Sequence, residues 1–188
     1  YMRLMPSTNQ GPMKLLFAGW NAETATALQL AQSMAPNGSE ITVLSDDGFG
    51  GVSLKSTKNC KLRVVRGVPT AYTDLERAKV HEMDAVIIMP DHAQGKAEED
   101  ASVLATILQT RAVCGDYAEK EKLAKVREPH VVATLNTDSA RSIVELMGQV
   151  SQNDSPVTPD VIMSDEIVGG ALLQVAANPK LAGLFDAL

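Results

Sequence analysis

Residues 14–21 read KLLFAGWN, a short apolar run that ends at a glycine, and this stretch decides the fold. The run is continuously apolar rather than alternating, which is typical of a strand buried on both faces of a parallel sheet. Five further runs of this kind follow: ITVLS at 41–45, LRVVR at 62–66, AVIIM at 85–89, VVATL at 131–135 and VIM at 161–163. The sequence therefore predicts six buried parallel strands.

In most of the segments between these runs, apolar residues recur at the spacing of one face of a helix. The expected helices cover residues 22–35, 73–80, 98–113 and a stretch from Asp138 to Gly148. Thr73 and Glu76 have the spacing of a capping box, and Asp138 is expected to cap the last of these helices. The same spacing places Leu108 and Ile143 on inward faces. Residues 46–59 contain three glycines and little helical period, so they predict a loop, and the charged residues 115–129 predict a solvated helix extension or loop.

Strands that alternate with helices predict an α/β fold, a Rossmann-like doubly wound parallel sheet with strand order 3-2-1-4-5-6. In such a sheet, ligands bind at the carboxyl ends of the first and fourth strands, where the strand order reverses. Residues 1–12 are interpreted as a linker, residues 13–163 as the Rossmann-like domain, and residues 164–188 as a pair of C-terminal helices.

Composition excludes several functional classes. The chain has 17 Lys and Arg against 23 Asp and Glu, a net charge of −6, and no basic run, which argues against nucleic-acid binding. Its apolar runs are too short to span a membrane, which predicts a soluble chain. The two cysteines and three histidines lack metal-ligand spacing, so we expect reduced, packed thiols. Because the sequence opens on Tyr1 in a linker-like stretch, we expect a piece of a longer protein.

The first candidate ligand-binding residues are Gly19, Trp20 and Asn21. They stand where a dinucleotide-binding fold carries G-x-G-x-x-G, and only the first glycine is present, with Asn21 and Thr24 at the other two positions. Asn21 would crowd a pyrophosphate, so it is either a polar ligand contact or a helix cap. Trp20 is expected to serve packing or an interface rather than ligand stacking. The backbone amides at the start of the first helix are expected to offer an anion site.

Acidic residues follow the second and fourth strands. Asp46 and Asp47 stand where an acidic residue holds a ribose hydroxyl, although an Asp pair before a glycine is also ordinary turn chemistry. Asp91 is placed to bond a ligand or to cap the next helix. His92 is the one histidine near this crevice, and no catalytic constellation or substrate domain accompanies it. We therefore predict no catalytic residues; the alternative is a small NAD(P)-binding oxidoreductase or nucleotide-binding enzyme.

The C-terminal segment is unusually apolar. Ser164 is a good helix cap, and Asp165 and Glu166 favour the first turn of a helix. Apolar residues then cover a wide arc of one helix and, after Pro179, one side of a second: Ile167, Val168, Ala171, Leu172, Val175, Leu181, Leu184, Phe185 and Leu188. This surface exceeds what one sheet can cover, so we expect it to pack on another subunit or domain. A soluble dimeric adaptor with an empty crevice is a third reading.

Taken in order, these segments resemble the RCK domain of the KTN or TrkA-N type, the ligand-sensing domain of potassium channels and transporters. The resemblance spans residues 13–188 and is carried by Gly19, Arg66-Gly67, DAVII at 84–88 and VIMSDEI at 161–167. Within that group, KLLFAGWN and MSDEIVGGALLQVA are most similar to the CASTOR/POLLUX ion channel family. In those proteins Gly-Trp-Asn also stands in place of the glycine fingerprint.

The resemblance implies a cytoplasmic regulatory domain of a potassium or other cation channel or transporter. Such a domain self-associates through its last two helices into a ring beneath a membrane pore domain, and a crevice ligand gates it by favouring one arrangement. The resemblance also adds Gly67 to the candidate set. The ligand is not identified: the incomplete glycine motif disfavours NAD, and Asp46, Asp47 and Asp91 offer carboxylate oxygens to a divalent cation.

Overall fold

The computed structural model describes residues 11–46, 49, 54–91, 95–123, 125–150 and 159–163. They contain one six-stranded sheet, all parallel, with the order β3-β2-β1-β4-β5-β6. Its strands are β1 (Lys14–Ala18), β2 (Ser39–Ser45), β3 (Cys60–Arg66), β4 (Ala85–Ile88), β5 (His130–Leu135) and β6 (Asp160–Met163). The predicted Rossmann-like fold and its strand order are confirmed, and each predicted run overlaps a strand.

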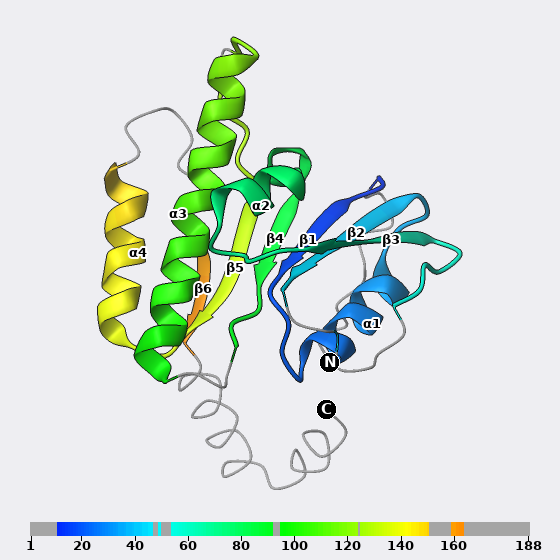
Figure 1. Ribbon diagram of the computed structural model, residues 1–188, viewed down its shortest axis with the longest axis horizontal. Helices are drawn as coiled ribbons and strands as arrows, with labels where there is room; N and C mark the ends of the chain where they lie inside the picture. Colours follow the sequence, from blue (N-terminus) through cyan, green and yellow to red (C-terminus); the bar gives the residue numbers. More distant parts are fainter. Residues whose placement is uncertain are drawn as a thin grey trace, which may run out of the picture.

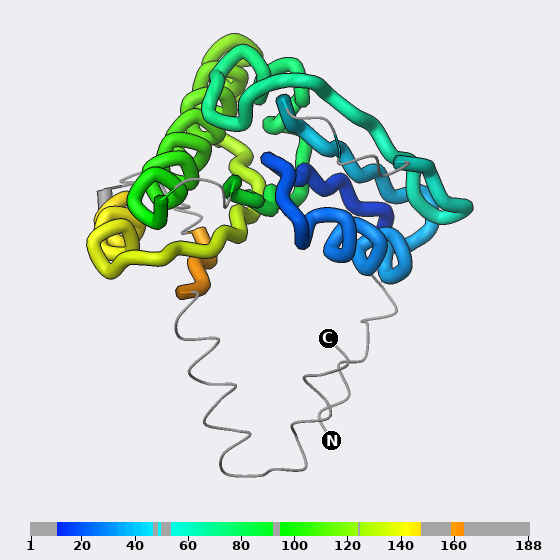
Figure 2. The backbone as a smooth tube through the Cα atoms, turned by 60° about the horizontal axis from the view of Figure 1, so that its bottom comes forward, coloured from blue at the N-terminus to red at the C-terminus, as the bar shows by residue number. Residues whose placement is uncertain are grey.

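The helices lie on both sides of this sheet (Figure 1). They are α1 (Thr24–Met34), α2 (Tyr72–Arg77), the 3-10 helix η1 (Val80–Glu82), α3 (Lys96–Lys120) and α4 (Asp138–Val150). Figure 2 shows α1 on one face and the longer α3 on the other. The charged stretch after residue 115 continues α3 as far as Lys120, which is the helix extension that was one of the two predictions for it.

Two hydrophobic clusters fill the space between the sheet and its helices. In β1, Leu16 packs on the side of α3 with Ile107, whereas Phe17 packs on the side of α1 with Leu28. Successive residues of a strand point to opposite faces, so a strand with both faces covered needs an unbroken apolar run. KLLFA is such a run because β1 lies at the centre of the sheet.

The strands away from the centre of the sheet are not buried on both faces. On the α1 side of β4, β5 and β6, Ile87 and Val132 are half-buried and Ile162 is 42% exposed. Within the described residues, α1 is the one helix on this side, and it packs over β1 to β3 (Figure 1). The edge strand β3 is also open, with Val64 43% exposed. The prediction of six strands buried on both faces was therefore wrong for the outer ones.

The side-chain caps predicted at Thr73 and Asp138 were wrong. Ala71 precedes α2 and makes no side-chain cap bond, so Thr73 lies inside the helix. At α4, Thr137 Oγ1 accepts a hydrogen bond from the Ala140 amide at 3.3 Å, and Asp138 is the first helical residue. The chain enters α2 two residues earlier, and α4 one residue earlier, than the cap pattern suggests.

Two apolar side chains that were predicted to point inward are exposed. Leu108 on α3 is 50% exposed and Ile143 on α4 is 43% exposed, and Leu146 beside the latter is 57% exposed. Val103, Ile107 and other residues of the same helices cover the sheet fully. The apolar stripes of α3 and α4 are therefore wider than the sheet face beneath them.

Some of the remaining predictions concern residues that the structure describes, and others concern residues outside that part. Cys60 and Cys114 are free and buried, as expected. No described helix combines the length and the apolar character that a membrane crossing requires. Residues 54–59, which lead into β3, hold no helix, in agreement with the predicted loop. Asp47, His92, residues 1–10 and the expected C-terminal helices at 164–188 lie outside the described residues.

Candidate functional site

Gly19 makes the turn that leads from β1 to the first helix. Its φ is 108°, a conformation that side chains disfavour. Its amide donates to the Leu44 carbonyl oxygen at 2.8 Å, and the Met89 amide donates to the Ala18 carbonyl oxygen at 2.9 Å. A Cβ on Gly19 would stand 2.0 Å from the Met89 carbonyl oxygen. The glycine is therefore required both by the backbone conformation and by the closeness of β4.

The Asn21 side chain closes the start of α1. Its Oδ1 accepts hydrogen bonds from the backbone amides of Glu23 and Thr24, both at 3.1 Å, and from Thr24 Oγ1 at 2.9 Å. Thr24 Oγ1 accepts one in return from the Asn21 amide at 2.9 Å. These bonds satisfy amides that the helix itself leaves open. Of the two readings of Asn21, the helix cap is the one that the structure contains.

Asn21 also reaches across the sheet. Its Nδ2 donates to the Pro90 carbonyl oxygen at 2.9 Å, which ties the turn after β1 to the turn after β4. In a dinucleotide-binding fold, the amides at this helix start receive the pyrophosphate. Here the Asn21 carboxamide is bonded to those of Glu23 and Thr24, so the anion site expected at this position is filled by the protein itself.

A pocket of about 320 Å³ opens at the carboxyl ends of β1, β2 and β4. Four of the predicted site residues line it together: Gly19, Trp20, Asp46 and Asp91. The pocket lies where the strand order reverses, as the topology predicts. Trp20 also packs edge-on against Phe49, with ring centroids 5.2 Å apart, so its expected packing role is present as well.

Gly67 stands behind the pocket wall rather than in it. Its amide donates to the Ser45 carbonyl oxygen at 3.1 Å, and a Cβ there would stand 2.5 Å from Asp74 Cγ. Asp74 Oδ2 in turn accepts the Val68 amide at 2.8 Å, and Val68 lines the pocket. Because Gly67 has no side chain, Asp74 can come close enough to bond the Val68 amide, and this bond holds Val68 in the pocket wall.

The prediction missed two groups of lining residues. Val68, Pro69 and Thr70 follow β3 directly, so the rule that selected Asp46 and Asp91 would also have selected them. Ser102 and Thr106 come from α3. They lie four positions apart, in a polar row that Thr110 continues, which was an available signal.

The described lining of this pocket carries negative charge only. Its charged residues are Asp46 and Asp91, both exposed. Carboxylates repel phosphate, and they attract hydroxyl donors or cations. No group of three or more His, Cys, Asp or Glu side chains that could hold a metal ion occurs among the described residues.

A buried acidic residue joins α3 to the segment after β5. Asp100 is 3% exposed, and its Oδ1 accepts the Asn136 amide at 2.8 Å and Asn136 Nδ2 at 3.2 Å. Its Oδ2 accepts Thr137 Oγ1 at 2.6 Å. Thr137 is the residue that caps α4, so Asp100 fixes the starts of α3 and α4 relative to one another.

Replacing Asn21 by alanine is expected to lower the free energy of unfolding by about 1–2 kcal/mol, because the cap and the bond to Pro90 are both lost. Asn21→Asp should lower the free energy of unfolding by less, since aspartate retains the oxygen that caps the helix and lacks only the amide donor to Pro90. Urea unfolding of the three proteins measures the difference. Gln29→Ala, on the exposed side of α1, is the control and should change stability little. Equal effects of Asn21→Ala and Gln29→Ala would contradict the capping role.

The fold, not the sequence, links this chain to known proteins. No protein-family model and no curated protein matches it. The human SLO3 gating ring shares its fold with a TM-score of 0.58 over 86% of this chain, at 13% identity. GsuK bound to ADP shares it with a TM-score of 0.53 over 90% of this chain, at 16% identity. The chain spans 26% and 35% of those two chains, about a quarter to a third of their length.

Proposed function

We propose that this chain is a cytoplasmic regulatory domain of the RCK type, part of a potassium or other cation channel or transporter, and not an enzyme. The single observation that carries the proposal is a ligand-sized pocket at the switch point of a fold that the SLO3 gating ring shares. In this role, a ligand in the crevice favours one arrangement of an assembled ring and thereby acts on a membrane pore domain. Membership of the CASTOR/POLLUX group is part of the proposal and rests on KLLFAGWN and MSDEIVGGALLQVA.

We propose that the crevice binds its ligand without placing a phosphate group on the amides at the start of α1. The Asn21 carboxamide bonds the amides there, and Asp46 and Asp91 make the pocket acidic. Asp46 directly follows β2, at the place from which this fold holds a ribose hydroxyl. Trp20, Asp46, Asp47 and Asp91 are therefore the proposed contacts for a nucleoside or a divalent cation, while Gly19, Asn21 and Gly67 shape the site.

Calorimetric titration of the chain with adenosine, ADP, NAD(H) and Ca²⁺ tests this proposal. We expect ADP to bind no more tightly than adenosine, because the phosphate position is filled. Asn21→Gly should restore a preference for ADP of about tenfold, since glycine is tolerated at a helix cap and frees the amides. Asp46→Asn should weaken nucleoside or Ca²⁺ binding, and Asp116→Asn, an exposed carboxylate on α3, is the matched control.

Two results would contradict the proposal. Tight binding of NAD(H) with turnover of a reductant would favour the alternative, an NAD(P)-dependent oxidoreductase. Binding that is unchanged in Asp46→Asn and in an Asp91→Asn variant would place the ligand outside the crevice.

Self-association is proposed to use the C-terminal residues 164–188. The half-exposed faces of β5 and β6, and the exposed Leu146 on α4, support the need for a covering partner. Joint replacement of Leu172 and Leu184 by aspartate should convert an associated chain into monomers in sedimentation velocity. Leu30→Asp, at a position 60% exposed on α1, is the control and should leave association intact. Dissociation by Leu146→Asp alone would place the interface on α4 instead.

A further inference from the structure

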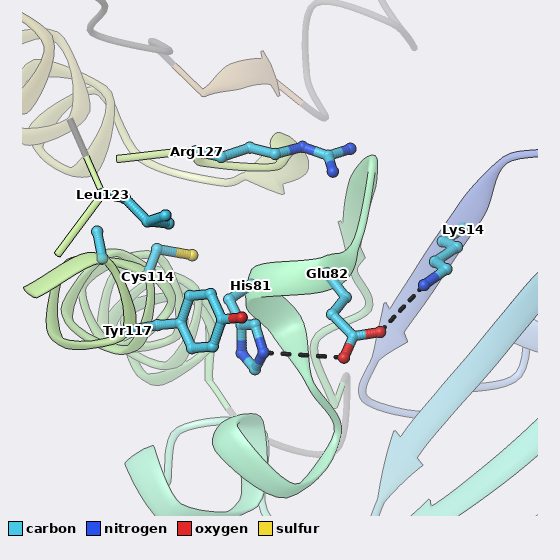
Figure 3. A pocket seen from close by; sticks show the side chains of 8 residues that line it. Lys14, His81, Glu82, Cys114, Tyr117, Leu123 and Arg127 are labelled. Carbon is cyan, nitrogen blue, oxygen red and sulfur yellow. Dashed lines mark hydrogen bonds and ion pairs between the residues drawn. The ribbon is translucent and has the colours of Figure 1, made fainter. Parts of the chain in front are cut away.

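A second pocket, of about 330 Å³, lies at the amino end of the sheet (Figure 3). Lys14 begins β1, His81 and Glu82 belong to η1, Tyr117 comes from the last turns of α3, and Arg127 precedes β5. The proposed regulatory function makes no use of this pocket, because the crevice described above is at the opposite, carboxyl end of the strands. Its volume falls within the range of about 300–1,000 Å³ that small-molecule sites occupy.

The inner wall of this amino-end pocket is aromatic and uncharged. The Tyr117 ring stacks on the His81 imidazole, with centroids 3.9 Å apart and planes 18° apart. Burial lowers the pKa of His81, which favours the neutral imidazole. Burial raises the pKa of the Cys114 thiol to about 12, so this residue is neutral as well. The wall therefore suits the flat or apolar body of a ligand.

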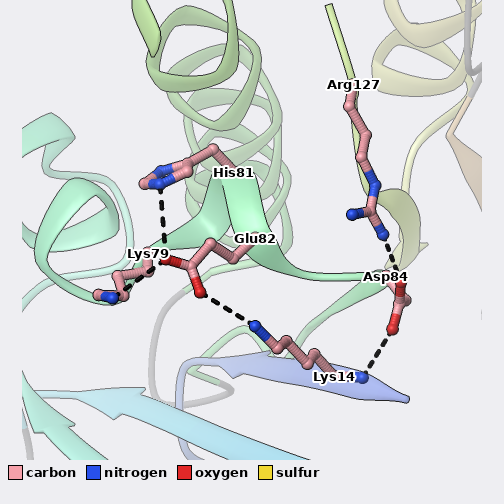
Figure 4. A network of polar contacts seen from close by, with 6 residues as sticks. All are labelled: Lys14, Lys79, His81, Glu82, Asp84 and Arg127. Carbon is pink, nitrogen blue, oxygen red and sulfur yellow. Dashed lines mark hydrogen bonds and ion pairs between the residues drawn. The ribbon is translucent and has the colours of Figure 1, made fainter. Parts of the chain in front are cut away.

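The mouth of the pocket carries a network of charges (Figure 4). Glu82 pairs with the Nζ atoms of Lys14 and Lys79, both at 3.0 Å, and these bonds lower its pKa to about 2. Asp84 pairs with Arg127 and also accepts the Lys14 backbone amide at 2.7 Å. Of the described residues that line the pocket, Lys14 and Arg127 are cationic and Glu82 is anionic, which leaves a net positive charge here in a chain whose overall net charge is −6.

Two features of the pocket indicate unused capacity to bind polar groups. His81 Nδ1 is buried and has no hydrogen-bond partner within the described part of the chain. A buried polar atom of this kind normally finds a partner in the protein, in water or in a ligand. Arg127 gives one guanidinium nitrogen to Asp84, and a guanidinium carries five N–H donors in a planar fork that matches a carboxylate.

We propose that the amino-end pocket binds a small organic anion, a carboxylate on an aromatic or apolar body. Arg127 and Lys14 hold the carboxylate at the mouth, and the body lies against the paired rings of Tyr117 and His81. A cation would meet the excess of positive charge, and inorganic phosphate would leave the aromatic wall without a contact.

The test is a titration of the isotopically labelled chain with benzoate, followed by nuclear magnetic resonance. Benzoate should cause saturable shifts at His81, Tyr117 and Arg127 and none at Trp20 in the crevice. Benzamide has the same shape without the charge, and it should bind about tenfold more weakly. Equal binding of the two compounds, or no saturable shift at His81 and Tyr117 with millimolar benzoate, would overturn the proposal.

Substitution of the cations provides the second arm. Arg127→Gln should weaken benzoate binding about tenfold and abolish the preference over benzamide, and Arg127→Lys should retain part of both. Arg66→Gln, an exposed arginine at the far end of β3, is the control and should bind as the unaltered chain does. If Arg127→Gln does not fold, the comparison of benzoate with benzamide on the unaltered chain decides the question alone.

Discussion

Gly19→Ala is expected to lower the free energy of unfolding by about 3 kcal/mol or more, because it combines backbone strain with overpacking. The residue has a φ of 108°, and the new Cβ would stand 2.0 Å from the Met89 carbonyl oxygen. Relief would require β1 and β4 to separate, which breaks the bond between the Met89 amide and Ala18. Urea unfolding followed by circular dichroism measures the loss.

Two other glycines separate the causes of this loss. Gly38 has a φ of 86°, but a Cβ there would lie 3.5 Å from the nearest atom, a side-chain carbon of Pro12. Gly38→Ala should therefore show the conformational cost alone, about 1–2 kcal/mol. Gly115 lies in α3 with nothing within 4 Å of its Cβ position, so Gly115→Ala should stabilise the chain by about 0.5–1 kcal/mol. If Gly19→Ala and Gly38→Ala have equal effects, the close approach of β4 contributes nothing.

Asp100→Ala is expected to lower the free energy of unfolding by about 2–4 kcal/mol, since it removes the acceptor of three hydrogen bonds from two residues. The Asn136 amide and the Thr137 hydroxyl would lose a buried partner that lies 2.8 and 2.6 Å away. The starts of α3 and α4 would then no longer be held together. Urea unfolding measures the stability, and hydrogen exchange at the Asn136 amide measures the local opening.

An exposed carboxylate on the same helix is the matched control. Asp116 accepts one bond, from Tyr72 Oη at 2.8 Å, and Asp116→Ala should change stability by less than about 1 kcal/mol. Asp100→Asn keeps an acceptor oxygen and should fall between the two alanine variants. The role assigned to Asp100 does not survive if its alanine variant is as stable as that of Asp116.

The sheet could be predicted because each strand carries its own signal. Runs such as KLLFA and AVIIM identify strands locally, and alternation with helices then restricts the strand order to a few common topologies, of which 3-2-1-4-5-6 is one. The first residue of each helix was harder to predict than the strands. Thr73 and Asp138 have good capping chemistry, but Ala71 and Thr137 are the residues at which the chain enters the helices, and tertiary packing determines that entry point.

The crevice could be predicted only in part. Asp46 and Asp91 follow strands, so topology alone brings them to one edge of the sheet. The bond from Asn21 to Pro90 joins residues that are 69 positions apart, and no local pattern announces it. The amino-end pocket was missed entirely because Lys14, His81 and Arg127 share no spacing, and the fold alone brings them together.

The Asn21 carboxamide has a consequence for how this domain can respond to its surroundings. In a fold that receives a phosphate at the first turn, an empty site leaves helix-start amides without partners. Here the turn carries its own substitute, so the amides of Glu23 and Thr24 have a partner without a bound phosphate. With the binding proposed above, a change of shape would begin at the turns around Asp46 and Asp91, and the bond from Asn21 to Pro90 would pass a movement of the β4 turn to the turn after β1. If the crevice binds its ligand as proposed, the phosphate compounds of a cell would find the amides of Glu23 and Thr24 already bonded to Asn21.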